Sequence, residues 1–184
     1  MILHGNNMIL CPFDRRHADQ TRAWVNDLEL ARLLDRARPV SDADHERWFA
    51  TINGRDDCVF FAIESGGQHA GNVWLWGIDP RHRKAEVRIL IGTSQHQGKG
   101  LGSEAILLLA KFAYERLNLH RLYAYVLGTN SRARRAFEKA GFELEGVLRQ
   151  DRWVGDQFAD VCFLGTMLPV QALATTPARL ACGR

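Results

Sequence analysis

Apolar positions along the chain follow two spacings, and these spacings predict an ordered series of helices and strands. In several segments apolar residues recur every three to four positions, as they do on one face of an amphipathic helix. Other segments are short runs of branched and aromatic residues bounded by turn residues, which is typical of strands. The predicted strands are 7–13, 58–65, 69–78, 85–92, 121–128, 142–154 and 158–168, and the predicted helices are 17–34, a short helix after Ser41, 101–117 and 130–140.

The order of these elements predicts one α+β domain. Gly66-Gly67 and Gly155-Asp156 are turn signals that join neighbouring strands into antiparallel pairs. Because the helices do not alternate strictly with the strands, we expect a single mixed, mostly antiparallel sheet flanked by helices. The expected domain covers residues 1–170, and residues 171–184 show no apolar period, so we expect a disordered tail there.

Composition and charge disfavour several classes of protein. A hydrophobic share of 46% and a formal net charge of +3 are ordinary for a soluble chain, and no basic and aromatic residues interleave as they do in nucleic-acid-binding proteins. No apolar run approaches the roughly 20 residues that cross a membrane, and the N-terminus lacks a signal-peptide pattern, so a cytoplasmic location is expected. The cysteines and histidines show no metal-ligand spacing, so no metal is expected.

A glycine-rich loop between a predicted strand and a predicted helix carries the strongest chemical signal. Gly98, Gly100 and Gly102 stand at alternate positions around the start of that helix. Glycine lets the backbone approach a ligand closely, and the first amides of a helix lack internal partners and carry partial positive charge. The loop therefore predicts a pyrophosphate site, and a flexible turn before a capped helix is the alternative interpretation.

Two common nucleotide-binding motifs do not fit this loop. A Walker A loop needs four residues between its first glycine and Gly-Lys, but five residues separate Gly92 from Gly98. Gly100 also stands where that motif needs serine or threonine. The dinucleotide motif G-x-G-x-x-G fails as well, since these glycines read G-x-G-x-G. The loop thus disfavours an ATP, GTP or dinucleotide site.

A second segment favours a different phosphate ligand. Its pattern consists of Asn130, Ala133, Ala136, Phe137, Lys139, Gly141 and Phe142. Together with Gln95-x-x-Gly98-x-Gly100, this pattern resembles the Gcn5-related N-acetyltransferase (GNAT) superfamily, which uses acetyl-CoA. The stretches 82–92, 95–102, 117–126 and 141–161 resemble its spermidine and ribosomal-protein acetyltransferases, and residues 24–49 resemble its acetyltransferases of nucleotide-linked amino sugars.

The resemblance implies a fold in which strands splay apart at the acetyl-CoA site. The glycine loop would bind the pyrophosphate of CoA through backbone amides, and a backbone amide near Leu90 or Ile91 would polarise the thioester carbonyl. These residues also have structural alternatives. Lys99 can be merely solvated, and Ser103 and Asn130 can be helix caps. The residues expected to bind acetyl-CoA are Leu90, Ile91, Gln95, Gln97, Gly98, Lys99, Gly100, Leu101, Gly102, Ser103, Asn130 and Phe137.

Catalysis by direct attack of an amine on the thioester needs a base more than an acid. An alkyl amine with a pKa of about 10 arrives protonated, whereas a thiolate with a pKa near 8.5 regains a proton easily. Glu86, on the strand before the loop, is the expected base. The alternative is that Glu86 is only a half-exposed strand residue with no role in catalysis. Phe137 stands where the family often has a tyrosine acid, and Tyr123 or Tyr125 is a substitute.

Two arginines and two tryptophans carry the prediction of the acceptor. Arg36 and Arg38 would repel a polyamine and bind phosphate, so we expect a small-molecule amino sugar on a nucleotide. Trp74 and Trp76 share one strand face and are expected to line the acceptor pocket, although core packing is the alternative. A polyamine, a protein N-terminus and a non-catalytic acyl-CoA-binding module are the other hypotheses. Nucleic acid and membrane are not expected partners, and a homodimer is one open expectation.

Overall fold

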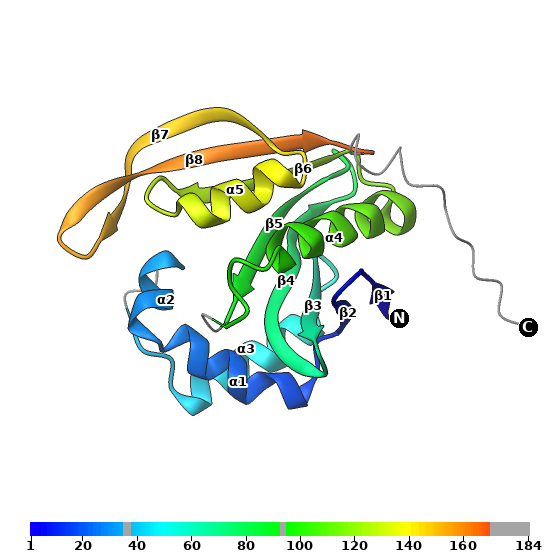
Figure 1. Ribbon diagram of the computed structural model, residues 1–184, viewed down its shortest axis with the longest axis horizontal. Coiled ribbons are helices and arrows are strands. Elements are labelled where there is room, and N and C mark those ends of the chain that lie inside the picture. Colours follow the sequence, from blue (N-terminus) through cyan, green and yellow to red (C-terminus); the bar gives the residue numbers. More distant parts are fainter. Residues whose placement is uncertain (35–37, 93–94, 170–184) are drawn as a thin grey trace, which may run out of the picture.

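The computed structural model describes residues 1–34, 38–92 and 95–169, whose strands form one open sheet flanked by helices (Figure 1). The sheet has the strand order β1-β2-β3-β4-β5-β6-β8-β7, and its neighbours are antiparallel except for the parallel pair β5–β6. The predicted α+β fold with one mixed, mostly antiparallel sheet is confirmed.

The bounds of the elements follow the predicted order. The strands are β1 (Leu3–His4), β2 (Ile9–Pro12), β3 (Cys58–Ser65), β4 (Gln68–Asp79), β5 (Lys84–Ile91), β6 (Arg121–Leu127), β7 (Glu143–Val154) and β8 (Gln157–Met167). The helices are α1 (Arg15–Val25), α2 (Leu28–Leu33), α3 (Asp42–Asn53), α4 (Leu101–Leu117) and α5 (Ser131–Lys139). The predicted tail 171–184 lies outside the described residues.

Helices pack on both faces of the sheet, because alternate residues of a strand point to opposite sides. On one face, α4 contributes its apolar side to the main core, which includes Val73 of β4 and Val87 of β5. On the other face, Trp24 of α1 and Leu30 of α2 pack against Leu90 of β5. The hairpin of β7 and β8 curves past α5 towards the side of the molecule where α2 lies (Figure 1).

The single helix predicted at 17–34 is wrong, because α1 and α2 are separate helices. Asn26 ends α1, and its side chain makes two hydrogen bonds with the backbone of Val40, at 2.9 and 2.7 Å. Asp27 begins α2, since its carboxylate accepts hydrogen bonds from the N–H groups of Glu29 and Leu30, both at 3.0 Å. Local side-chain bonds of this kind compete with the helix ladder, so the apolar period continues although the helix does not.

Helix α4 has the predicted bounds and is the element that follows the glycine loop. Gly100 precedes it with φ of +82°, and Asn118 ends it with a left-handed φ of +52°. Its first turn lies next to α5. Over the described parts of the chain, no helix has both the length and the apolar character that a membrane crossing requires.

The strands β5 and β6 splay apart, as expected from the family resemblance. They pair in parallel only from Lys84 with Arg121 to Glu86 with Tyr123. Beyond that point each strand keeps its other neighbour: β5 remains paired with β4 up to Ile91, and β6 remains paired with β8 up to Leu127. The result is a gap inside the sheet, with two facing strand edges.

Candidate active site

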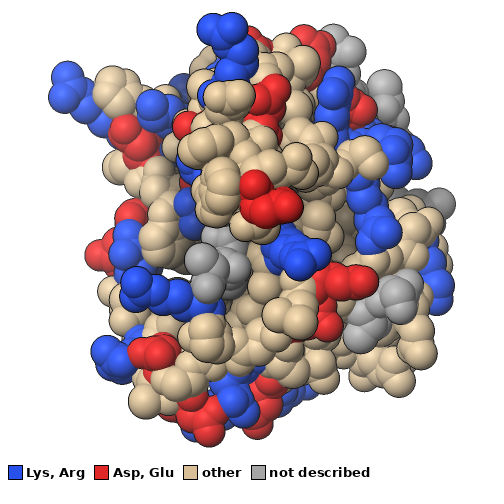
Figure 2. All heavy atoms as spheres, turned by 90° about the vertical axis from the view of Figure 1, so that its left-hand side faces the viewer, with Lys and Arg blue, Asp and Glu red and all other residues tan. Residues whose placement is uncertain are grey.

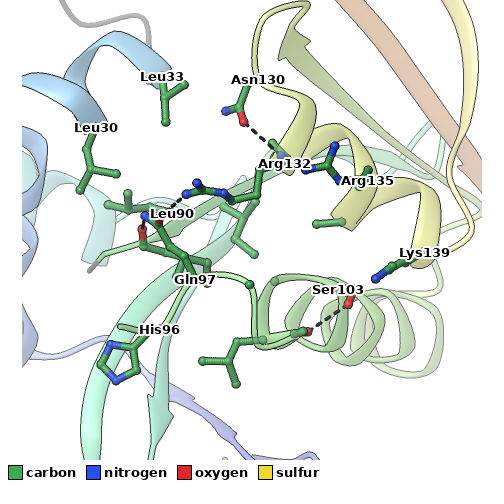
Figure 3. Close-up of a pocket in the computed structure, with 18 of the residues that line it drawn as sticks. Leu30, Leu33, Leu90, His96, Gln97, Ser103, Asn130, Arg132, Arg135 and Lys139 are labelled. Carbon is green, nitrogen blue, oxygen red and sulfur yellow. Dashed lines mark hydrogen bonds between the residues drawn. The ribbon is translucent and has the colours of Figure 1, made fainter. Parts of the chain in front are cut away.

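Two cavities meet at the gap between β5 and β6. The loop cavity, with a volume of about 320 Å³, lies among the glycine loop, α5 and α2 (Figure 3). The sheet cavity, with a volume of about 500 Å³, lies over one face of β4 and β5. Both are lined by Leu33, Leu34, Ile89, Leu90, Asn130 and Ala133. A long ligand can therefore extend from one cavity into the other through the gap.

The glycine loop presents an anion site to the loop cavity. Gly98 and Gly100 adopt φ values of +76° and +82°, which L side chains rarely adopt, so glycine is required by the backbone here. Gly100 is the N-cap of α4 and supplies no side-chain hydrogen bond to the helix. The first amides of α4 are thus left for a ligand, and the helix dipole adds partial positive charge. The hydroxyl of Ser103 donates to the Gly100 carbonyl at 2.9 Å, so it does not compete for these amides.

Most of the residues expected to bind acetyl-CoA line the loop cavity. The structure places Leu90, Ile91, Gln97, Gly98, Gly100, Leu101, Gly102, Ser103 and Asn130 there. Gln95 and Lys99 are exposed and are not part of its lining. Phe137 lines the sheet cavity instead and is only 3% exposed, packed against Phe142. Asn130 also caps α5 through a 3.0 Å hydrogen bond from Ala133 N–H, so it has a structural role as well.

Basic side chains of α5 complete the wall of the loop cavity. Arg132, Arg135 and Lys139 line it, and Arg132 donates a hydrogen bond to Gln97 of the loop (Figure 3). Arg134 is directed elsewhere and pairs with Glu138 at 2.7 Å. Figure 2 looks onto this side of the molecule and shows Lys and Arg side chains bordering a recess. The cavity thus offers cations as well as amides to a ligand with several phosphates.

The backbone of β5 distinguishes between the two residues expected to polarise a carbonyl. Gly92 N–H donates to the Ala70 carbonyl beside β4, at 2.9 Å. Because successive peptide groups of a strand point to opposite sides, the N–H of Leu90 points towards β4. The N–H groups of Ile89 and Ile91 then point into the gap, where β6 no longer pairs with them. Ile89 or Ile91, rather than Leu90, is the residue whose amide can meet a ligand in the gap.

Glu86 lies on the sheet face that the sheet cavity exposes. The register pairs Trp76 with Glu86 and Trp74 with Arg88, so these four side chains point to the same face and line the same cavity. The guanidinium of Arg88 donates two hydrogen bonds of 2.8 Å to the Glu86 carboxylate, and the Glu86 side chain is 12% exposed. Each carboxylate oxygen can accept further hydrogen bonds, so an amine or a water molecule can still contact it.

Aromatic rings form much of the wall of the sheet cavity. Trp74 stacks on Phe60 with ring centroids 4.6 Å apart and an interplanar angle of 16°. The ring of Trp76 has two guanidinium groups near its faces, Arg55 at 4.3 Å and Arg88 at 5.2 Å. Among the described lining residues, the charged ones are Glu86, Arg88 and Arg152. The cavity therefore offers one carboxylate, two guanidinium groups and several ring faces to an acceptor.

Two tyrosines, which were expected as substitutes for the tyrosine that the family often has at position 137, lie beside this site. Tyr125 lines the sheet cavity and is 47% exposed, and its ring lies 6.0 Å from that of Tyr123. Burial, and then the charge of Glu86, raise the pKa of Tyr123 above its ordinary value. The phenol is protonated at neutral pH, as an acid must be, but the raised pKa makes it a weaker proton donor than an ordinary tyrosine.

Of the two arginines predicted for the acceptor pocket, the structure describes Arg38, and Arg38 does not line the sheet cavity. Arg36 lies outside the described residues, and Arg38 is exposed and lines a third cavity of about 300 Å³ between α1 and α3, which shares Thr21, Val25 and Trp48 with the sheet cavity. Sequence reasoning instead missed Asn72, which is fully buried, lines the sheet cavity and donates to Thr21 Oγ1 at 2.9 Å. The sequence feature that could have indicated Asn72 is an amide side chain within an otherwise apolar strand.

Comparison with known proteins identifies the family to which this geometry belongs. Residues 7–143 match the model described as an acetyltransferase (GNAT) domain, which covers most of the chain. The chain belongs to the GNAT acetyltransferase family.

Individual relatives fall within the same family. The spermidine N(1)-acetyltransferase of Escherichia coli K12 is 37% identical over 98 residues, which is 53% of this chain and 52% of that protein, so the match spans about half of the relative. The putative ribosomal N-acetyltransferase YdaF of Bacillus subtilis is 28% identical over 76% of this chain and 74% of that protein. The Vibrio cholerae spermidine N-acetyltransferase solved with CoA and spermine has a TM-score of 0.82 at 24% identity, over 89% of this chain and 96% of that one, and shares the fold.

Proposed function

We propose that this protein transfers an acetyl group from acetyl-CoA to a primary amine of a small molecule. The observation that carries the proposal is the gap between β5 and β6, which joins an anion site at the start of α4 to an aromatic cavity that holds Glu86. Acetyl-CoA supplies the acyl group as a thioester and carries the phosphates that the anion site would bind. Family membership agrees with this arrangement.

Each group of residues has a defined task in the proposed reaction. The amides at the start of α4 bind the pyrophosphate, and Arg135 and Lys139 bind the 3′-phosphate of CoA. The N–H of Ile89 or Ile91 donates a hydrogen bond to the carbonyl oxygen as negative charge develops on it. Glu86 accepts the proton of the attacking ammonium, directly or through a water molecule, so that the nitrogen lone pair can attack the carbonyl carbon. The departing thiolate takes a proton from water or a tyrosine.

The comparisons favour a polyamine acceptor over the nucleotide-linked amino sugar expected from Arg36 and Arg38. The relatives include spermidine acetyltransferases, and Arg38 does not line the sheet cavity. An ammonium group in that cavity would meet the carboxylate of Glu86 and the ring faces of Trp48 and Trp74. Cation–π contacts of this kind contribute roughly 0.5–2 kcal/mol each. We therefore propose a polyamine-like acceptor.

An acceptor panel tests this choice. We expect kcat/KM with spermidine to exceed that with any nucleotide-linked amino sugar by about tenfold or more, because both arginines of the described cavity lining already have acidic partners: Arg88 pairs with Glu86, and Arg152 pairs with Asp151. Release of free CoA thiol reports turnover for every amine on one scale. Equal or higher kcat/KM with the amino sugar would reverse the assignment. Binding of acetyl-CoA without turnover of any amine would favour a non-catalytic acyl-CoA-binding module.

The basic face of α5 is predicted to recognise the 3′-phosphate of CoA. Replacing both Arg135 and Lys139 by alanine should weaken CoA binding by about tenfold to 100-fold, because one charge-assisted hydrogen bond contributes about 1.5–3 kcal/mol. Binding of dephospho-CoA, which lacks this phosphate, should change little, and calorimetry measures both ligands. Arg134→Ala is the matched control, since Arg134 pairs with Glu138 and lies outside the cavity lining. An equal loss for both ligands would assign these cations to the pyrophosphate instead.

A further inference from the structure

The carboxylate of the proposed base is held by an arginine of the same strand face. Arg88 donates from Nε to Glu86 Oε1 and from Nη2 to Glu86 Oε2, both at 2.8 Å. The two residues stand two positions apart on β5, so both side chains point to the same side of the sheet. Two parallel hydrogen bonds of this kind fix the direction of a carboxylate as well as its position. The Glu86 carboxylate is therefore oriented before a substrate arrives.

The arginine is itself held in place by an aromatic ring. The guanidinium carbon of Arg88 lies 5.2 Å from the centroid of the Trp76 ring, and Trp76 is the cross-strand partner of Glu86. The guanidinium of Arg55 lies over the same ring at 4.3 Å, and two hydrogen bonds of 2.7 and 2.6 Å tie Arg55 to the Asp57 carboxylate. A planar guanidinium can stack on a ring while its edge makes hydrogen bonds. The ring therefore restrains Arg88 while the edge of Arg88 holds Glu86.

General-base catalysis depends on where the carboxylate points. A base must lie within about 2.6–3.2 Å of the atom whose proton it takes, or reach it through one water molecule. An unrestrained glutamate samples several rotamers, and a displacement of about 1 Å in an active site can lower a rate about 100-fold. We propose that Arg88 is a positioning residue, which holds the Glu86 carboxylate towards the acceptor nitrogen. The inference rests on the proposed function, in which Glu86 takes the proton of the attacking amine.

Arg88 acts through Glu86 and is not itself suited to bind the acceptor. A guanidinium is always charged, so it repels an amine that arrives as a cation and cannot take a proton from it. The ion pair is also a weak source of folding stability, because the Arg88 side chain is 43% exposed and water screens its charge. The carboxylate oxygens keep further lone pairs that can accept from the amine or from water. What Arg88 contributes is the direction of these lone pairs.

Arg88→Met removes the two hydrogen bonds and keeps an apolar side chain that can pack on the Trp76 ring. We expect kcat for acetyl transfer to spermidine to fall about tenfold, as for a misplaced catalytic group. The KM for spermidine should not rise, because the substitution removes a cation that repels it. The KM for acetyl-CoA should change little, since Arg88 lines the sheet cavity and not the loop cavity. Arg88→Lys should recover only part of kcat, because an ammonium group supplies the charge without the planar guanidinium.

Arg121→Met is the matched control for the loss of a paired arginine from the sheet. Arg121 also donates to a glutamate of the sheet, Glu145, at 2.7 Å, and its guanidinium carbon lies 5.9 Å from the centroid of the Phe163 ring. It lines neither the loop cavity nor the sheet cavity, so its replacement should leave kcat near the parent value. Release of CoA thiol gives kcat and KM for every variant, and melting temperatures show whether each variant is folded.

A double-mutant cycle decides whether Arg88 acts through Glu86. In the Glu86→Gln background, Arg88→Met should change kcat by less than about twofold, because no base remains to be positioned. An equal loss in both backgrounds, a parent-like kcat in Arg88→Met, or full recovery by lysine overturns the positioning role. A higher KM for spermidine at unchanged kcat would place Arg88 in contact with the substrate and overturns it as well. These outcomes leave the proposed function standing, whereas a parent protein that turns over no amine contradicts the proposed function and this inference together.

Discussion

Replacing Glu86 by glutamine should lower the turnover of acetyl transfer about 100-fold or more, which is the usual effect of losing a general base. Glutamine keeps the shape of the side chain and can accept one of the two hydrogen bonds from Arg88, but it cannot take a proton. The demand for a base is large, because an alkyl amine with a pKa of about 10 is almost entirely protonated near neutral pH. The KM for acetyl-CoA should change little, since Glu86 lines the sheet cavity and not the loop cavity.

Glu145→Gln is the matched control for this experiment. Glu145 is also a glutamate of the sheet held by an arginine, Arg121, with a hydrogen bond of 2.7 Å, but it lines neither cavity. Its replacement should leave turnover near the parent value. The measurement is a pH–rate profile from about pH 6 to about pH 9 for both variants. If Glu86→Gln keeps near-parent turnover over that range, Glu86 is a strand residue and the base is water or another group.

Replacing Gly100 by aspartate should weaken acetyl-CoA binding about 100-fold or more while the fold is retained. A Cβ atom added at Gly100 meets no atom within 4 Å, so the side chain fits sterically. Its carboxylate, however, would lie where the phosphates are expected, and two like charges about 4 Å apart repel by about 4 kcal/mol near a protein surface. The thermal stabilisation that acetyl-CoA confers on the parent should disappear in this variant.

Gly67→Asp separates the electrostatic effect from backbone strain. Gly67 lies in the turn between β3 and β4, has a φ of +74°, and has the same open space around an added Cβ. The strain of an L residue at positive φ is thus similar at both positions. Gly67→Asp should lower the melting temperature slightly and keep the full shift with acetyl-CoA. An undiminished shift in Gly100→Asp would remove the glycine loop from the phosphate site.

The parts of the site that sequence could predict are those fixed by backbone geometry. Gly98 and Gly100 require positive φ, and the bounds of α4 follow from its apolar period, so both features are visible in the chain. The shared face of Trp74 and Trp76 follows from strand alternation in the same way. The order of strands and helices predicted a mixed sheet, and the family resemblance implied the gap.

The parts that sequence could not predict depend on which segments pack together. The break between α1 and α2 results from hydrogen bonds between Asn26 and Val40, which are 14 positions apart. Arg38 was assigned to the acceptor pocket by its charge, and the fold places it on a cavity that adjoins the sheet cavity without lining the sheet cavity itself. The partnership of Glu86 with Arg88 was also missed, although alternation along β5 places both on one face. Neighbours of this kind follow from tertiary packing, which overrides local preference.

The gap between β5 and β6 separates main-chain recognition from side-chain recognition, and this has a consequence for how the protein can diverge. The peptide groups of the glycine loop, of α4 and of Ile89 or Ile91 are unaltered by most point substitutions. The acceptor side consists of side chains such as Trp74, Trp76 and Tyr125, each of which one codon change can replace. A lineage built on this sheet can therefore exchange one amine for another while its cosubstrate stays the same.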